Sequence, residues 1–136
     1  MRALLARLMG YGVTGGIAAI VDAGGFALLL RAGLGVAAAG TASFCAAAVV
    51  NYLLSSRFVF AGRRSAQGFA LFFVVALIGL AVNLGITLAG VYWLGIPPVP
   101  AKIVGIGVAF LVNFALNLRI VFRPSGAAAP RQGTPR

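Results

Sequence analysis

Long apolar runs, separated by short polar or glycine- and proline-containing segments, dominate the chain. The runs are residues 8–30, with the single charge Asp22, residues 32–56 and 65–101, with no charge, and residues 103–118. A helix needs about 20 residues to cross the hydrocarbon core of a bilayer. The longest run has room for one such helix and a turn. The pattern therefore predicts four transmembrane helices, near residues 8–30, 35–56, 68–94 and 99–121.

The second half of this pattern repeats the first. The ten residues from Asn51 to Phe60 match those from Asn113 to Phe122, 62 positions later, and five of the ten are identical. The first and third helices align at an offset of 61, which places Asp22 over Asn83. An internal repeat indicates the architecture before any local feature does, and two helices per half give both halves one orientation. Lys102 aligns with Thr41 if the offset is 61 and with Gly40 if it is 62, so its charge has no counterpart in the first half.

The predicted fold is thus an all-α integral membrane protein made of two tandem two-helix repeats in the same orientation. The repeats cover about residues 8–60 and 68–122, within a transmembrane domain of residues 1–123. Residues 124–136 are rich in proline and small residues, a composition typical of disorder. We expect them to form a disordered cytoplasmic tail.

Composition supports the membrane assignment and narrows the function. The chain is 62% hydrophobic and 9% charged, whereas soluble domains carry about 25% charged residues. Eleven basic residues face one acid, but they stand singly or in pairs between apolar runs, as in membrane proteins, so we expect no nucleic-acid partner. The absence of histidine, with one acid and one cysteine, leaves little material for catalysis or metal binding. We expect neither an enzyme nor a metal or cofactor site.

Basic residues also predict the orientation. The N-terminus, the middle loop and the C-terminal side hold nine of them, and the two predicted hairpin turns hold only Arg31 and Lys102. The positive-inside rule then places both termini in the cytoplasm. The nine are Arg2, Arg7, Arg57, Arg63, Arg64, Arg119, Arg123, Arg131 and Arg136.

Each predicted helix carries its polar residues on the same face as small residues, because positions three and four apart share a face. Small residues allow close backbone approach, and polar side chains bond across helices, so these faces are expected to surround a shared interior. For the asparagines, structural bonding and substrate contact are equally good interpretations. They are Asn51, Asn83, Asn113 and Asn117.

The charged residues within the helices are stronger candidates for function. An isolated charge in the bilayer costs roughly 2.5 kcal/mol or more, so Asp22 should be paired or functional. Lys102 either pairs with Asp22 or extends its ammonium group toward the outer membrane surface. Arg57 and Arg119, at the cytoplasmic helix ends, either anchor the chain to anionic headgroups or clamp a phosphate, which a guanidinium group can bind bidentately.

Four features together resemble the GtrA-like family of small four-helix membrane proteins, over about residues 7–123. They are the glycine-rich approach to Asp22, the Asn51 to Phe60 stretch, the Pro97 to Lys102 entry into the last helix, and the Asn113 to Phe122 stretch. The resemblance implies that the chain moves, or helps to move, a polyprenyl-phosphate-linked sugar across the bacterial inner membrane during cell-surface polysaccharide synthesis. It also implies a glycosyltransferase partner.

Two other functions remain open from the sequence. One is a non-transporting scaffold that recruits a membrane glycosyltransferase. The other is a proton-coupled small exporter in which Asp22 carries the proton. Because four helices enclose little volume, we expect a homodimer or a complex, surrounded by membrane lipids. The expected substrate-binding residues are Asp22, Asn51, Arg57, Asn83, Lys102, Asn113, Asn117 and Arg119.

Overall fold

The computed structural model of the chain describes the backbone of residues 2–58 and 66–121, and the side chains of residues 9–10, 12–55 and 70–116. Its four helices are α1 (Arg2–Arg31), α2 (Val36–Phe58), α3 (Ala66–Tyr92) and α4 (Pro98–Val121). All four predicted helices are confirmed, and their bounds agree to within two residues except at the start of α1. This helix begins at Arg2 rather than near residue 8, because arginine ends an apolar run but is a good helix former.

All four helices are long and apolar enough to cross a bilayer. The chain is therefore a multi-pass membrane protein. Large apolar side chains such as Ile20 and Leu111 lie exposed on the outside of the bundle, where lipid is their solvent. Helices suit this environment because they satisfy their own backbone hydrogen bonds.

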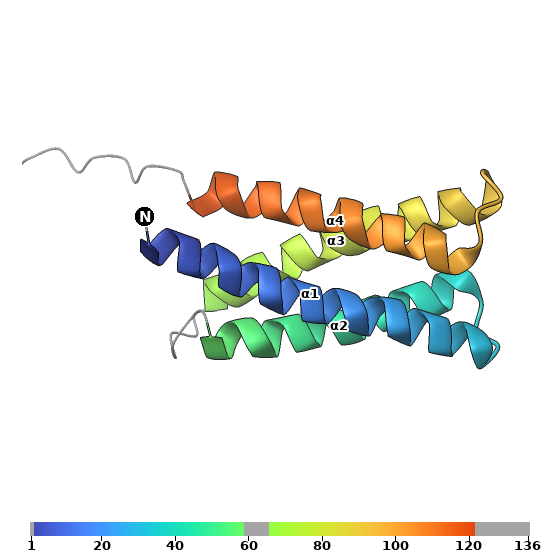
Figure 1. The fold of residues 1–136 in the computed structure, drawn as a ribbon, viewed down its shortest axis with the longest axis horizontal. Coiled ribbons are helices and arrows are strands. Elements are labelled where there is room, and N and C mark those ends of the chain that lie inside the picture. The colour runs from blue at the N-terminus through green and yellow to red at the C-terminus, as the bar shows by residue number, and fades with distance from the viewer. Residues whose placement is uncertain (1, 59–65, 122–136) are drawn as a thin grey trace, which may run out of the picture.

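The helices form two hairpins that pack against each other. α1 packs on α2 and α3 on α4, and the hairpins meet through α1 with α4 and α2 with α3. In Figure 1, α1 and α3 run in one direction while α2 and α4 return. We call the end with the α1–α2 and α3–α4 connections the hairpin end, and the end where α1 begins and α4 finishes the terminal end.

The two hairpin turns use glycine at corresponding positions. Gly33 and Gly95, 62 residues apart, have φ angles of 91° and 66°, a region that glycine enters without steric cost. At the end of α1, the amide of Gly33 donates to the carbonyl of Leu30 (3.0 Å) and that of Leu34 to Leu29 (3.1 Å). This is a Schellman motif, which satisfies the last carbonyls of a helix.

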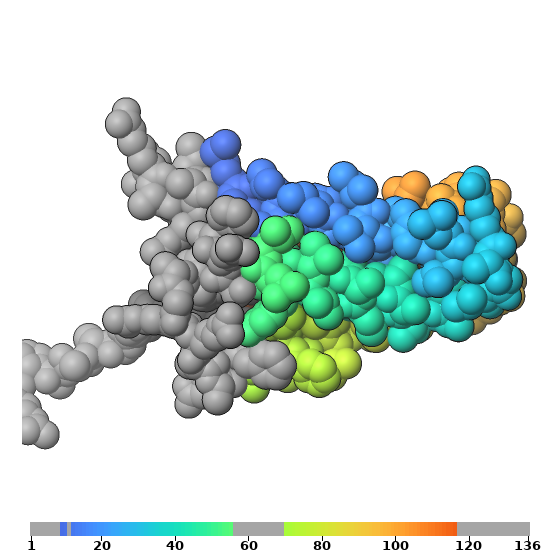
Figure 2. All heavy atoms as spheres, turned by 90° about the horizontal axis from the view of Figure 1, so that it is seen from below, coloured from blue at the N-terminus to red at the C-terminus, as the bar shows by residue number. Residues whose placement is uncertain are grey.

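The interior of the described bundle is small and polar, whereas its outside is large and apolar. Its buried hydrophobic residues are four alanines and Phe26, and the buried polar group includes Asp22, Asn83 and Lys102. Figure 2 shows the atoms of α1 and α2 packed side by side over this interior. Close approach of alanine-lined helices leaves room in the interior for only a few longer side chains, and apart from Phe26 these are polar.

Candidate functional site

A network of polar side chains from all four helices occupies the interior of the bundle. Asp22 comes from α1, Ser43 from α2, Asn83 from α3 and Lys102 from α4, and each is at most 3% exposed. Burial in the membrane removes water as a partner for these groups, so they must satisfy one another. We call these four residues the buried network.

The carboxylate of Asp22 is the centre of the buried network. Its Oδ1 accepts a hydrogen bond from Ser43 Oγ (2.6 Å) and forms an ion pair with Lys102 Nζ (2.9 Å). Its Oδ2 accepts a hydrogen bond from Asn83 Nδ2 (3.0 Å). Three donors from three helices therefore converge on the only acidic side chain in the chain.

The ammonium group of Lys102 is equally well satisfied. Besides Asp22, it donates to Asn83 Oδ1 (2.8 Å) and to the carbonyl of Gly40 (3.4 Å). Its Nζ also lies 5.5 Å from the centroid of the Phe26 ring, within the range of a cation–π interaction. Of the two arrangements open from the sequence, Lys102 adopts the pairing with Asp22 and does not extend to the surface.

Positions that the repeat makes equivalent meet in this network. Asp22 and Asn83, which bond directly, are 61 residues apart, and Lys102 and Gly40 are 62 apart. Equivalent positions of two halves touch only where the halves face each other, so the network lies between the two hairpins. The sequence offered Thr41 or Gly40 as the position equivalent to Lys102. In the structure Lys102 bonds to the carbonyl of Gly40.

Two glycines hold the surrounding helices at close range. A Cβ atom at Gly105 would lie 2.6 Å from the carbonyl oxygen of Asn83 and 2.8 Å from Thr87 Oγ1. One at Gly40 would lie 3.0 Å from Leu84 Cδ1. Thr87 Oγ1 in turn donates to the carbonyl of Asn83 (2.8 Å). Glycine is therefore required at Gly105 for α4 to reach the part of α3 that carries Asn83.

The network lies deep in the membrane. Tyr92 and Trp93 are exposed at the hairpin end, and such aromatic residues typically mark a membrane–water interface. Asn83 precedes Tyr92 by nine residues, which is about 13 Å along a helix, and Asp22 precedes Arg31 by the same distance. With a hydrocarbon core about 30 Å thick, both estimates place the Asp22 carboxylate within the core, in the half nearer the hairpin end.

The asparagines of the terminal half are arranged differently. Asn51 and Asn113 are half-buried. The Oδ1 of Asn51 accepts one long hydrogen bond, from Ser55 Oγ (3.5 Å). The Oδ1 of Asn113 is buried with no hydrogen-bond partner within the described part of the chain. Its Nδ2 packs on α3 where Gly79 leaves space, since a Cβ there would lie 2.8 Å away.

The structure thus brings together three of the predicted site residues, Asp22, Asn83 and Lys102. Asn51 and Asn113 lie apart from them, toward the terminal end. The side chains of Arg57, Asn117 and Arg119 fall outside the described residues, although their backbone belongs to α2 and α4.

Ser43 and Gly40 are bonding partners in this cluster that were not among the predicted site residues. Ser43 lies on the same small and polar face of its helix as Asn51, and this periodicity was the available signal. Gly40 contributes only a carbonyl group, which residue type cannot reveal. The described residues contain no group of three or more potential metal-ligating His, Cys, Asp or Glu side chains.

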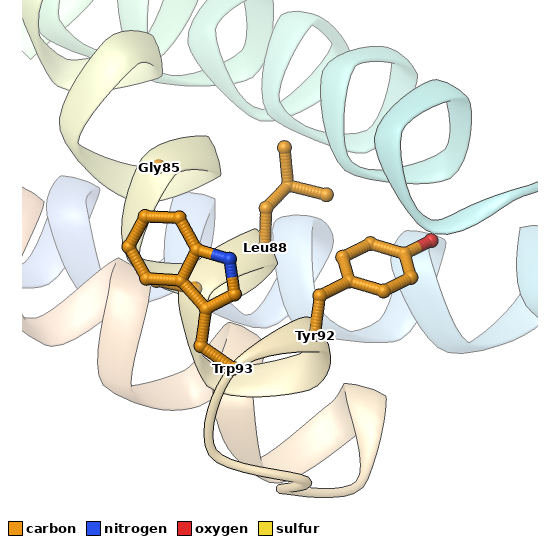
Figure 3. Close-up of a pocket in the computed structure, with 5 residues that line it drawn as sticks. Gly85, Leu88, Tyr92 and Trp93 are labelled. Carbon is orange, nitrogen blue, oxygen red and sulfur yellow. The ribbon is translucent and has the colours of Figure 1, made fainter.

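Two apolar grooves mark the outside of the described bundle. One, of about 300 Å³, lies along α3 at the hairpin end. Figure 3 shows Leu88, Tyr92 and Trp93 along this groove, where Gly85 leaves space. The second, of about 260 Å³, lies between α1 and α4 and is lined largely by glycines with Phe110. We call the second one the α1–α4 groove.

A family model for the GtrA/DPMS transmembrane domain matches residues 10–122 of the chain. The chain belongs to this family. The match covers α2, α3 and α4, α1 from residue 10 onward, and the whole buried network, so the resemblance expected from the sequence is confirmed. No solved structure matches the chain at a significant level.

The buried network lies within the part of the chain that matches the GtrA/DPMS family model. In this GtrA/DPMS domain the interior holds a paired acid and base, and the bonds Asp22–Asn83, Asp22–Lys102 and Lys102–Gly40 join the two hairpins. Chemically, the arrangement can hold an oxyanion, because an ammonium, a hydroxyl and an amide donor point at one place.

Proposed function

We propose that the chain translocates, or assists in translocating, a polyprenyl-phosphate-linked sugar across the bacterial inner membrane, for cell-surface polysaccharide synthesis. The observation that carries the proposal is the buried network, an ion pair among membrane-spanning helices in a chain of the GtrA/DPMS family. Intramembrane charges are costly and mark substrate or ion pathways by default. The proposed role is non-catalytic, since the chain holds one acid and no histidine.

The residues suit the chemistry of such a substrate. A lipid-linked sugar phosphate presents an anion and hydroxyl groups, which ammonium or guanidinium donors and amide side chains bind respectively. We propose that Asp22, Asn83 and Lys102 act within the hydrocarbon core, in the half nearer the hairpin end, and that Asn51, Asn113, Asn117, Arg57 and Arg119 act nearer the terminal end. The Oδ1 of Asn113, buried with no hydrogen-bond partner among the described residues, is a candidate acceptor for a sugar hydroxyl.

The same proposal includes an orientation and partners. Because most basic residues flank the terminal end, this end faces the cytoplasm under the positive-inside rule. The chain would act as a homodimer or beside a membrane glycosyltransferase, for which the exposed apolar helix faces offer contact area.

Reconstitution in liposomes tests the proposal. The purified chain should accelerate transbilayer movement of a fluorescent or radiolabelled polyprenyl-phosphate sugar, and Lys102→Ala should abolish most of that acceleration. The matched control is Leu111→Ala, a lipid-exposed position on the same helix, which should keep the wild-type rate. Equal rates with empty liposomes and with wild-type protein would refute translocation by the chain alone.

A scaffold for a glycosyltransferase is the second candidate. It is favoured by the two grooves, which are apolar and lie on the outside of the described bundle, and by the saturated hydrogen bonding of Lys102. Under this hypothesis a glycosyltransferase co-purifies in a fixed ratio and keeps its membrane activity with Lys102→Ala. Loss of sugar transfer in that variant, with the complex intact, would count against the scaffold.

The proton-coupled exporter is the least supported. The family that matches the chain is GtrA/DPMS, and both carboxylate oxygens of Asp22 already have donors in the structure. Transport that is independent of a pH gradient, in the same liposomes, would exclude it.

A further inference from the structure

The donors around Asp22 form a site for an oxyanion in their own right. Lys102 Nζ, Ser43 Oγ and Asn83 Nδ2 lie 2.9, 2.6 and 3.0 Å from carboxylate oxygens. They come from α2, α3 and α4, and the anion comes from α1. The site therefore consists of three helices that supply donors and a fourth that supplies the ligand.

The anion is the chain's own, and no other side chain could replace it. Asp22 is the single acid in the sequence, so removal of its carboxylate leaves the donors without an internal counterion. A phosphate group offers the same kind of acceptor, with more oxygens and a higher charge, and such charge-assisted hydrogen bonds are the strong ones.

We propose that Lys102, Ser43 and Asn83 bind the phosphate group of the lipid-linked substrate, and that the Asp22 carboxylate occupies this site until the phosphate displaces it. This inference rests on the proposed function and gives Asp22 a defined role within it. Asp22 is a competitor of the substrate, not a contact for it. Lys102 keeps its bonds to Asn83 Oδ1 and the Gly40 carbonyl throughout.

The exchange has a mechanical consequence. The bonds from Asp22 to Asn83 and Lys102 join α1, in the first hairpin, to α3 and α4, in the second. A phosphate that takes over these two donors removes these polar bonds between α1 and the second hairpin. Binding of substrate is thereby coupled to loss of these α1 bonds, whereas the bond from Lys102 to the Gly40 carbonyl still joins α4 to α2.

The α1–α4 groove indicates the source of the phosphate. It begins one helical turn from the network, with Ala19 three residues before Asp22 and Ile106 four residues after Lys102. The groove is apolar and lies between the two helices that the ion pair joins. A prenyl chain seated there would place its phosphate beside Lys102, whereas a free phosphate ion would gain nothing from an apolar groove.

Binding measurements on the full chain in phosphatidylcholine nanodiscs test the exchange, with a short-chain prenyl phosphate as the probe. Asp22→Asn should tighten binding on the order of tenfold, which corresponds to 1.4 kcal/mol, because the competitor is gone. Lys102→Met should remove measurable binding. Weaker binding by Asp22→Asn than by wild type would overturn the proposal, because Asp22 would then support the substrate.

Thermal unfolding supplies a second measurement if Asp22→Asn folds poorly. The probe should raise the melting temperature of Asp22→Asn more than that of wild type, because the phosphate replaces the missing anion. The neutral double variant Asp22→Asn/Lys102→Met is the control and should gain nothing. If Asp22→Asn stays unfolded at saturating prenyl phosphate, or gains no more than the control, the proposal is wrong.

Competition then separates the sources of phosphate. Inorganic phosphate and phosphatidylglycerol should fail to displace the prenyl phosphate from Asp22→Asn. Displacement by either one would overturn the assignment to a prenyl lipid. Failure of this inference is distinguishable from failure of the proposed function: wild type that translocates substrate, with no tighter binding by Asp22→Asn, contradicts only the exchange.

Discussion

The hairpin half and the terminal half of the bundle use polar residues in opposite ways. In the hairpin half, Asp22, Asn83 and Lys102 are fully buried and mutually bonded at 2.8–3.0 Å. In the terminal half, Asn51 and Asn113 are half-buried, and the Oδ1 of Asn113 has no partner within the described residues. Both sets lie on faces that the repeat makes equivalent.

The difference arises from where the repeat has lost its symmetry. Asn51 and Asn113 are identical, so the two halves offer the same group at this level. Asp22 stands opposite Asn83, and Lys102 opposite Gly40. Opposite charges cannot come from identical residues, so only the divergent positions can form an ion pair. Sequence divergence between the halves therefore produced an ion pair at Asp22 and Lys102. At Asn51 and Asn113, where the halves remain identical, the Oδ1 of Asn113 has no hydrogen-bond partner among the described residues.

The largest expected effect comes from breaking the ion pair. Asp22→Asn or Lys102→Met should each lower the free energy of unfolding by about 3–5 kcal/mol, because the remaining charge stays buried without its partner. Reversible unfolding in mixed micelles measures this. The double variant should lose clearly less than the sum of the two single variants. Strict additivity would show that the two side chains do not stabilise each other.

Moving the acid across the repeat should restore much of that loss. Asn83 Oδ1 already lies 2.8 Å from Lys102 Nζ, so Asp22→Asn/Asn83→Asp keeps a carboxylate on the lysine. We expect it to recover about 2 kcal/mol of the 3–5 kcal/mol lost by Asp22→Asn. Asn83→Asp alone is the control and should destabilise, since two carboxylates then share one lysine. A double variant no more stable than Asp22→Asn would contradict the equivalence of these positions.

Near the buried network, α4 should tolerate an added methyl group at one glycine but not at another. Gly105→Ala should destabilise by about 1–3 kcal/mol, the usual cost of overpacking, because its Cβ would strike the backbone of α3. Gly107 has open space around it, so Gly107→Ala should be neutral or stabilising by up to about 1 kcal/mol, from helix propensity. Thermal unfolding of both variants compares them directly. Equal effects would mean that the tight α3–α4 contact is absent.

The smallest effect is expected in the terminal half. Asn113→Ala should change the free energy of unfolding by no more than about 0.6 kcal/mol, the average for polar contacts between membrane helices. Asn83→Ala should cost about 1.5 kcal/mol or more, because both of its bonds involve a charged group. If Asn113 serves the substrate, its variant should slow translocation in liposomes while keeping wild-type stability. A large loss of stability would instead assign Asn113 a structural role.

How far the site could be predicted differs from residue to residue. Asp22 and Lys102 stand out in the sequence because a charge within an apolar run is costly, and Asn83 follows from its alignment with Asp22. The role of Ser43 could not be separated from that of other small polar residues on its helix face. The contribution of Gly40 is a backbone carbonyl, which depends on helix position and leaves no trace in the residue type.

The sequence by itself determined the four helices, their membrane environment and the duplicated frame, because hydropathy and segment length decide which segments can cross a bilayer. It also determined that any internal salt bridge must use Asp22, the only acid. Only the tertiary structure decided that Lys102 turns inward to that acid. A lysine side chain is long enough to reach either the surface or the interior. The close approach of α4 to α3 at Gly105, and the Gly40 carbonyl beside the ammonium, make the interior position the satisfied one.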